Sequence, residues 1–190
     1  MKKMILTILA GLLIGLDAYA QGTISFKNRN SSPVINAPVT HNDGVTKLSG
    51  SQYFAGLMAG TTANNLTQVG GVQTPFLTGA AAGYFFGGPV TLPGIPGGSA
   101  AFIEVVVWSS AFPNFASAIA SGLDDVWGMS GWSTGPLSVV TGNPNEFPPT
   151  TPAFLVGLTP FSLNVNIPEP SALALVGLGA AAVLVFRRRE

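Results

Sequence analysis

The sequence predicts an all-β fold, a β-sandwich or jelly-roll-like domain, over residues 21–167. Short segments in this region alternate apolar and polar residues with a period of two, as half-buried strands do. Clusters of glycine and proline separate these segments and indicate turns. Apolar segments flank the region on both sides, and we expect a signal-peptide helix within residues 1–20 and a transmembrane helix within residues 168–190.

Five segments in this region predict strands. Residues 23–28 alternate, with Ile24 and Phe26 on one face. Residues 162–167 alternate more regularly, and their predicted inward residues are Leu163, Val165 and Ile167, while Ser162, Asn164 and Asn166 face outward. Residues 101–109 are apolar on both faces except at Glu104, which is typical of a central strand in a packed sandwich. Residues 52–58 and 137–140 are further candidates.

Turn residues divide the strands. Asn42-Asp43-Gly44 predicts a tight turn. Gly87-Gly88-Pro89 and the Pro/Gly run at residues 93–98 are expected to bracket a short strand at residues 90–92. Residues 114–122 form the segment with helical spacing, which ends at Gly122.

The first 20 residues resemble a secretory signal peptide in their composition. Lys2 and Lys3 precede the largely apolar residues 4–16. Ala18-Tyr19-Ala20 is a small-x-small cleavage site, so the expected cut leaves Gln21 as the first residue. Signal peptidase is therefore a predicted processing partner.

The last 23 residues, 168–190, combine three features in a fixed order. Pro168-Glu169-Pro170 is held extended, because proline restricts both its own backbone and that of the preceding residue. The apolar segment Ser171–Phe186 follows, and as a helix it is about 24 Å long, short of an about 30 Å hydrocarbon core. Arg187, Arg188 and Arg189 come next and are expected to remain cytoplasmic.

This arrangement resembles the PEP-CTERM sorting signal of exported bacterial proteins. The resemblance implies that a membrane protease-transpeptidase, the exosortase, recognises Pro168-Glu169-Pro170 and removes the tail. It also implies an inner-membrane anchor before processing, and then residence in the cell envelope or extracellular matrix. The expected domains are therefore a signal peptide at 1–20, an exported β-rich domain at 21–167 and a sorting tag at 168–190.

Composition excludes several classes of function. Charged residues make up 8% of the chain, and no lysine or arginine occurs between Lys47 and Arg187. This scarcity of cations argues against nucleic-acid binding, which depends on neutralising phosphates. The absence of cysteine excludes disulfides, thiolate catalysis and cysteine-ligated zinc. We expect no cofactor and no metal.

One short pattern suggests a catalytic serine. Gly131-Trp132-Ser133-Thr134-Gly135 fits the G-x-S-x-G turn of α/β-hydrolases. That fold requires a histidine after the serine, whereas the single histidine, His41, lies before it. We interpret the pattern as a glycine-rich loop and His41 as a solvated loop residue.

The acidic residues suggest two further kinds of site. Asp124-Asp125 can contribute to a calcium site, but the alternating acids of an EF-hand are missing, so a turn pair is favoured. A glycosidase requires two facing carboxylates, for which Glu104 and one of Asp124, Asp125 or Glu146 are candidates. For Glu104 itself, a solvent-facing position at a sheet edge is favoured.

The aromatic residues leave one more alternative open. A platform on which sugars stack would use aromatic rings, and the candidates are Trp108, Trp127, Trp132, Tyr53 and Tyr84. We favour core positions for these residues over such a platform. The sequence therefore predicts a non-catalytic envelope or matrix protein with a structural or interaction role. The alternatives are a carbohydrate-binding module for matrix polysaccharide and a glycan-active enzyme.

Overall fold

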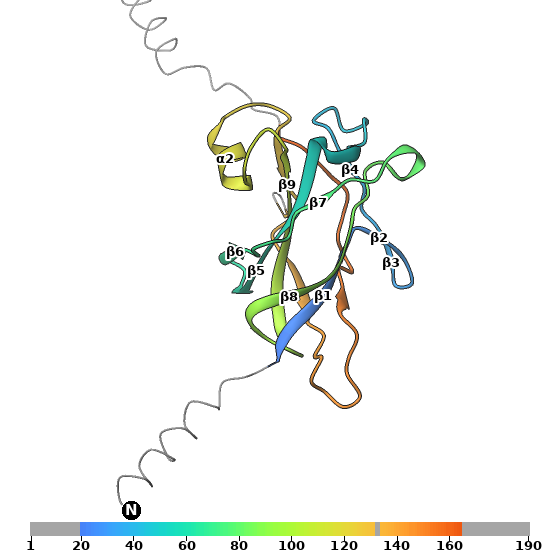
Figure 1. Cartoon of the computed structure of the whole chain (residues 1–190), viewed down its shortest axis with the longest axis vertical. Helices are drawn as coiled ribbons and strands as arrows, with labels where there is room; N and C mark the ends of the chain where they lie inside the picture. The colour runs from blue at the N-terminus through green and yellow to red at the C-terminus, as the bar shows by residue number, and fades with distance from the viewer. Residues whose placement is uncertain (1–19, 132–133, 165–190) are drawn as a thin grey trace, which may run out of the picture.

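The computed structural model describes residues 20–131 and 134–164. Strands are the main secondary structure in this part of the chain, as Figure 1 shows. The strands are β1 (Gln21–Lys27), β2 (Arg29–Ser31), β3 (Val34–Asn36), β4 (Val39–Thr40), β5 (Tyr53–Thr62), β6 (Asn65–Gln68), β7 (Thr74–Pro75), β8 (Phe86–Pro96), β9 (Ala100–Ser109), β10 (Trp127–Met129), β11 (Leu137–Val140), β12 (Ala153–Phe154) and β13 (Phe161–Ser162). The helices are the 3₁₀ turns η1 (Gly50–Gln52) and η2 (Gly79–Ala81) and the α-helix α2 (Phe115–Ala120). The all-β prediction is confirmed for the described residues.

The larger sheet has the strand order β10-β9-β5-β6, with β11 also paired to β9 and β7 also paired to β5. The smaller sheet has the order β12-β1-β8. Strands β2 and β3 form an antiparallel ribbon, and β13 lies parallel to β4. Strand β9 is central, as its apolar sequence predicts, because β5 covers one edge and β10 and β11 cover the other.

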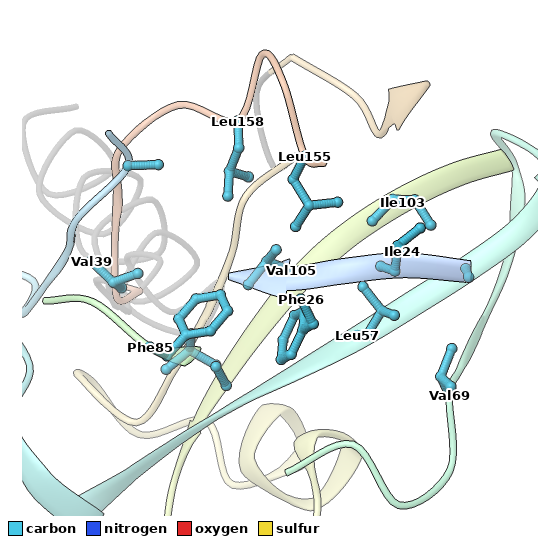
Figure 2. Packing of buried hydrophobic residues seen from close by; sticks show 14 of the residues in the cluster. Ile24, Phe26, Val39, Leu57, Val69, Phe85, Ile103, Val105, Leu155 and Leu158 are labelled. Carbon is cyan, nitrogen blue, oxygen red and sulfur yellow. The ribbon is translucent and has the colours of Figure 1, made fainter. Parts of the chain in front are cut away.

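The main core contains side chains from both sheets. Ile24 and Phe26 of β1 belong to the same buried cluster as Leu57 of β5 and Ile103 and Val105 of β9. Figure 2 shows these side chains converging with leucines from the segment after β12. The alternation in residues 23–28 is confirmed, since Ile24 and Phe26 are buried while the residues between them are half-buried. Burial of these apolar side chains is the main stabilising contribution to the fold.

A second cluster covers the other face of the larger sheet. Val106 and Trp108 of β9 pack there with Phe115 and Ala118 of α2. The indole of Trp108 lies over Gly56 of β5, where an added Cβ would be 2.5 Å from the ring. Residues 103, 105 and 107 of β9 therefore face the main core, while 106 and 108 face the cluster under α2.

Helix α2 occupies the predicted segment. The Asn114 side chain caps its start by accepting a hydrogen bond from the backbone N–H of Ser117 at 2.8 Å. Gly122 follows with φ of +63°, which suits glycine after a helix. Phe115 and Ala118 are buried, whereas Ile119 is 41% exposed.

The predicted turn at residues 87–89 is wrong, and the one predicted at residues 93–98 begins only at Gly97. Strand β8 runs without a break from Phe86 to Pro96. It lies at the edge of its sheet, where prolines are tolerated because one side of the strand has no partner that needs their N–H groups. Gly88 and Gly94 have positive φ angles and lie near the two register shifts against β1, so they bend the strand rather than end it.

The last predicted strand is shorter in the structure than in the sequence interpretation. Strand β13 comprises only Phe161 and Ser162, and Leu163 is buried as predicted. Residues 165–167, the predicted signal peptide at residues 1–20 except Ala20, and the predicted tag at 168–190 lie outside the described residues. Within 20–131 and 134–164, we find no helix with the length and apolarity needed to cross a membrane.

Candidate functional site

The end of the described chain, immediately before the predicted sorting tag, is fixed by hydrogen bonds. Parallel pairing places Phe161 opposite Val39 and Ser162 opposite Thr40. The backbone N–H of Leu163 then donates to the carbonyl of Thr40 at 3.0 Å. The chain is thus tied to β4 until one residue before Asn164.

Asn164 binds the turn that connects α2 to β10. Its backbone N–H donates to the carbonyl of Trp127 at 2.7 Å, and its own carbonyl accepts from the N–H of Asp125 at 3.0 Å. Its side-chain oxygen accepts from the N–H groups of Val126 and Trp127, and its side-chain nitrogen donates to the carbonyl of Leu123 at 3.0 Å. We call this set of hydrogen bonds between Asn164 and residues 123–127 the exit clamp.

The exit clamp was not predicted from the sequence. The alternation of residues 162–167 placed Asn164 on the solvent-facing side, whereas the structure shows it half-buried and bonded through both main chain and side chain. An asparagine after a strand is a common surface residue, so its type alone carries no signal for this role.

Asp125 extends the exit clamp to a second loop. Its Oδ2 lies 2.6 Å from Nδ1 of His41, and its Oδ1 accepts the backbone N–H of Asn42 at 2.8 Å. The hydroxyl of Tyr53 donates to the Asp125 carbonyl at 3.0 Å, and the His41 and Tyr53 rings meet edge to face. Burial, followed by the nearby Asp125 charge, raises the pKa of Tyr53.

This arrangement corrects the interpretation of His41 as a solvated loop residue. The imidazole is about three-quarters buried and pairs with a carboxylate that is distant in the sequence. Asp125 does lie in a turn, with φ of +58°, as the turn interpretation of Asp124-Asp125 implied. No sequence pattern links residues 41 and 125, because the pairing depends on how the two loops meet in three dimensions.

The turn after His41 forms as predicted. Gly44, with φ of +70°, donates its N–H to the carbonyl of His41, and the N–H of His41 donates to the carbonyl of Thr46. The carboxylate of Asp43 accepts hydrogen bonds from Thr46 and Val45, and these bonds lower its pKa below the ordinary value. Asp43 is therefore charged at neutral pH on an exposed turn.

The predicted edge position of Glu104 is wrong. The residue lies in the middle of the central strand β9, opposite Met58 of β5, and its side chain is buried. An added Cβ on Gly131 would clash with its Oε1, so the carboxyl lies against that glycine. Burial raises the pKa of Glu104.

Two of the candidate partners of Glu104 have other surroundings. Asp125 is bonded to His41 and Asn42, and Glu146 is exposed on the loop between β11 and β12. Among the residues that the structure describes, no group of three or more histidine and acidic side chains is suited to hold a metal ion. Trp132 and Ser133 of the G-x-S-x-G pattern lie outside the described residues.

The aromatic candidates that the structure describes, Trp108, Tyr84, Trp127 and Tyr53, are buried or half-buried. Trp108 is 2% exposed and Tyr84 is 8% exposed, so neither offers a ring face for stacking a sugar. Trp127 is half-buried and meets Phe115 edge to face at 6.0 Å. These placements confirm the core interpretation for Trp108 and Tyr84.

An open groove of about 390 Å³ lies between the segment after β6 and strand β8. Its lining residues are small or uncharged: Val69, Gly70, Gly71, Val72, Gln73, Thr74, Gly87, Pro89, Val90 and Thr91. The groove offers backbone groups and an amide for hydrogen bonding but no ionisable side chain, so its lining supplies no acid or base for catalysis.

Comparison with known families gives one match, which covers the predicted tag. Residues 166–189 match the PEP-CTERM protein-sorting motif. The matched range includes Pro168-Glu169-Pro170, the apolar segment 171–186 and the three arginines. Neither the curated proteins nor the solved structures give a match to this chain.

Proposed function

We propose that this chain, whose PEP-CTERM sorting motif marks it as an exported substrate of an exosortase, is a non-catalytic β-sandwich protein of the cell envelope or extracellular matrix. Its role is structural or interactive. The observation that carries the proposal is the sorting motif at residues 166–189, which follows the folded domain directly.

Before processing, the apolar segment Ser171–Phe186 anchors the protein in the inner membrane. Arginine is costly at the bilayer centre, about 2.5–3.5 kcal/mol on insertion scales, so Arg187–Arg189 stop translocation. The tail is then removed after the Pro168-Glu169-Pro170 segment. The β-rich domain passes to the envelope or to the medium.

A non-catalytic role is consistent with how the ionisable groups are used. His41 and Asp125 bind one another and join two loops, which is a structural arrangement. Glu104 is buried within a strand rather than facing a second carboxylate across a cleft. A fluorophosphonate probe tests the G-x-S-x-G pattern at Ser133, and we expect equal background labelling of the wild type and Ser133→Ala. Labelling of the wild type alone would show a reactive serine.

Fractionation of the full chain in a host with and without exosortase tests the sorting role. Replacing Pro168, Glu169 and Pro170 by alanine is expected to leave the full-length protein in the inner membrane. A matched control replaces Pro144, Asn145 and Glu146, which lie on an exposed loop and have similar chemistry. The control is expected to be processed like the wild type. If the alanine variant at 168–170 is processed normally, the tail is only a membrane anchor and not a sorting signal.

A further inference from the structure

The exit clamp limits how far the sorting motif reaches from the folded domain. Asn164 is held by residues 123–127, and only three residues separate it from Pro168. A fully extended chain spans at most about 3.6 Å per residue, so Pro168 lies within about 14 Å of Asn164. That distance is shorter than the about 30 Å diameter of a small folded domain.

Three exposed apolar side chains lie on the segments that meet near Asn164, where the described chain ends. Leu123, whose carbonyl accepts from Asn164, is 55% exposed, and Ile119 on the preceding helix is 41% exposed. Val45 is 79% exposed on the turn that Asp125 binds through Asn42. In Figure 1, α2 and the loop after β4 lie at the same end of the molecule. We call Ile119, Leu123 and Val45 the exit rim.

The short distance between Asn164 and the sorting motif indicates which partner contacts the exit rim. An enzyme that binds residues 168–170 is held close to the domain by the short connection. Its surface therefore has to lie against the exit rim. The exposed turn that carries Val45 has one acid, Asp43, and one base, Lys47, directly after it, so it has no net positive charge to attract anionic lipid headgroups. A protein surface is therefore a better partner for the rim than the lipid surface.

We propose that the exit rim is a docking surface for the exosortase, which rests on Leu123 and Val45 while it acts on the sorting motif. This inference rests on the proposed sorting function. The exit clamp is the positioning element, because it orients the rim relative to the start of the motif. Released protein no longer needs the rim for this purpose.

The test measures the rate of tail removal from the full chain by pulse–chase in a host with exosortase. The rim variant carries Leu123→Ser and Val45→Ser. The control variant carries Val34→Ser, a residue that is 78% exposed on the β2–β3 ribbon and so closely matches Val45. We expect the rim variant to be processed about tenfold more slowly, as is typical when central apolar contacts are lost, and the control to match the wild type.

A longer connection separates docking from any general effect on export. An about 20-residue Gly-Ser segment inserted after Asn164 has ends about 25 Å apart on average, which frees the enzyme from the rim. With this insertion, the rim variant and the wild type are expected to be processed at equal rates. A rim variant that is processed normally, or one that is equally slow with and without the insertion, would overturn the docking proposal.

Two further outcomes identify what has failed. If alanines at 168–170 do not block processing, the proposed sorting function itself fails. If they block it while the rim variant behaves as wild type, only the docking inference fails. Released protein that has lost the tail is expected not to bind vesicles of anionic lipid, whether it carries the rim substitutions or not. Vesicle binding by the released wild type that the rim variant loses would show that lipid, rather than the enzyme, contacts the rim.

Discussion

Two asparagines, Asn28 and Asn164, connect separate segments of the domain through side-chain hydrogen bonds to backbone groups, but they differ in burial. Asn28, after β1, donates from its side-chain nitrogen to the carbonyls of Ala37 and Gly83, and its oxygen accepts from the N–H of Phe85. Asn164, after β13, makes the corresponding set of bonds with residues 123–127. In each case one amide side chain bonds to the backbone of other segments of the chain.

The difference lies in burial. Asn28 is fully buried beside the main core, so water cannot replace a hydrogen bond lost there. Asn164 is half-buried at the exit, where water reaches part of the site. We therefore expect Asn28 to determine whether the domain folds. We expect Asn164 to fix the point on the domain from which the chain leads to the sorting motif.

Replacing Asn28 is expected to give the largest effect. Asn28→Ala removes the partner of the buried N–H of Phe85 and of the buried carbonyl of Ala37, whereas the carbonyl of Gly83 keeps the N–H of Val39. The substitution should lower the free energy of unfolding by about 3 kcal/mol. Urea unfolding of the full chain in detergent measures the change. Asn30→Ala is the matched control, since Asn30 makes one exposed bond to Pro33 and should change stability by less than about 1 kcal/mol. Similar losses for both variants would remove the distinction based on burial.

Replacing Asn164 should have a smaller and more local effect. Asn164→Ala removes the bonds to the N–H groups of Val126 and Trp127, at a cost of about 2 kcal/mol. Hydrogen exchange at these two amides is expected to rise about thirtyfold, with little change in the amides of β9. Uniformly faster exchange throughout the domain would show that Asn164 supports the whole fold rather than the exit.

The smallest expected effect concerns Glu104 and depends on pH. Burial raises the pKa of this carboxyl above its ordinary value of 4.5, so the folded protein binds the proton more tightly than the unfolded chain. Above the folded-state pKa, the ionised carboxylate therefore destabilises the fold. Glu104→Gln should melt at a higher temperature than the wild type at pH 8, and this advantage should vanish below pH 4.5. An advantage that is independent of pH would show that charge is not its cause.

The sequence predicted those elements whose signal is local. The apolar run of β9 predicted a central strand, and Asn114 and Gly122 marked the two ends of α2. Strand β8 was misread because its glycines and prolines have the composition of turns, and only its place at a sheet edge makes them compatible with a strand.

The exit clamp and the His41–Asp125 pair depend on contacts that no local sequence pattern encodes. His41 and Asp125 meet because two loops converge, and Asn164 bonds a turn some 40 residues before it. Glu104 was misplaced because its polarity suggested solvent, whereas its strand has neighbours on both sides. By contrast, the sorting motif was readable because recognition by an enzyme requires its residues in a fixed linear order.

The mass of the mature protein tests the central claim most directly. Intact-mass analysis of protein from the envelope and medium of a host with exosortase should find a chain that begins at Gln21 and lacks the sequence from about Ser171 onward. The same host without exosortase should yield protein that still carries residues 171–190. A main species that retains Met1–Ala20, or one that keeps the complete tail despite active exosortase, would contradict export and sorting through the two ends of this chain.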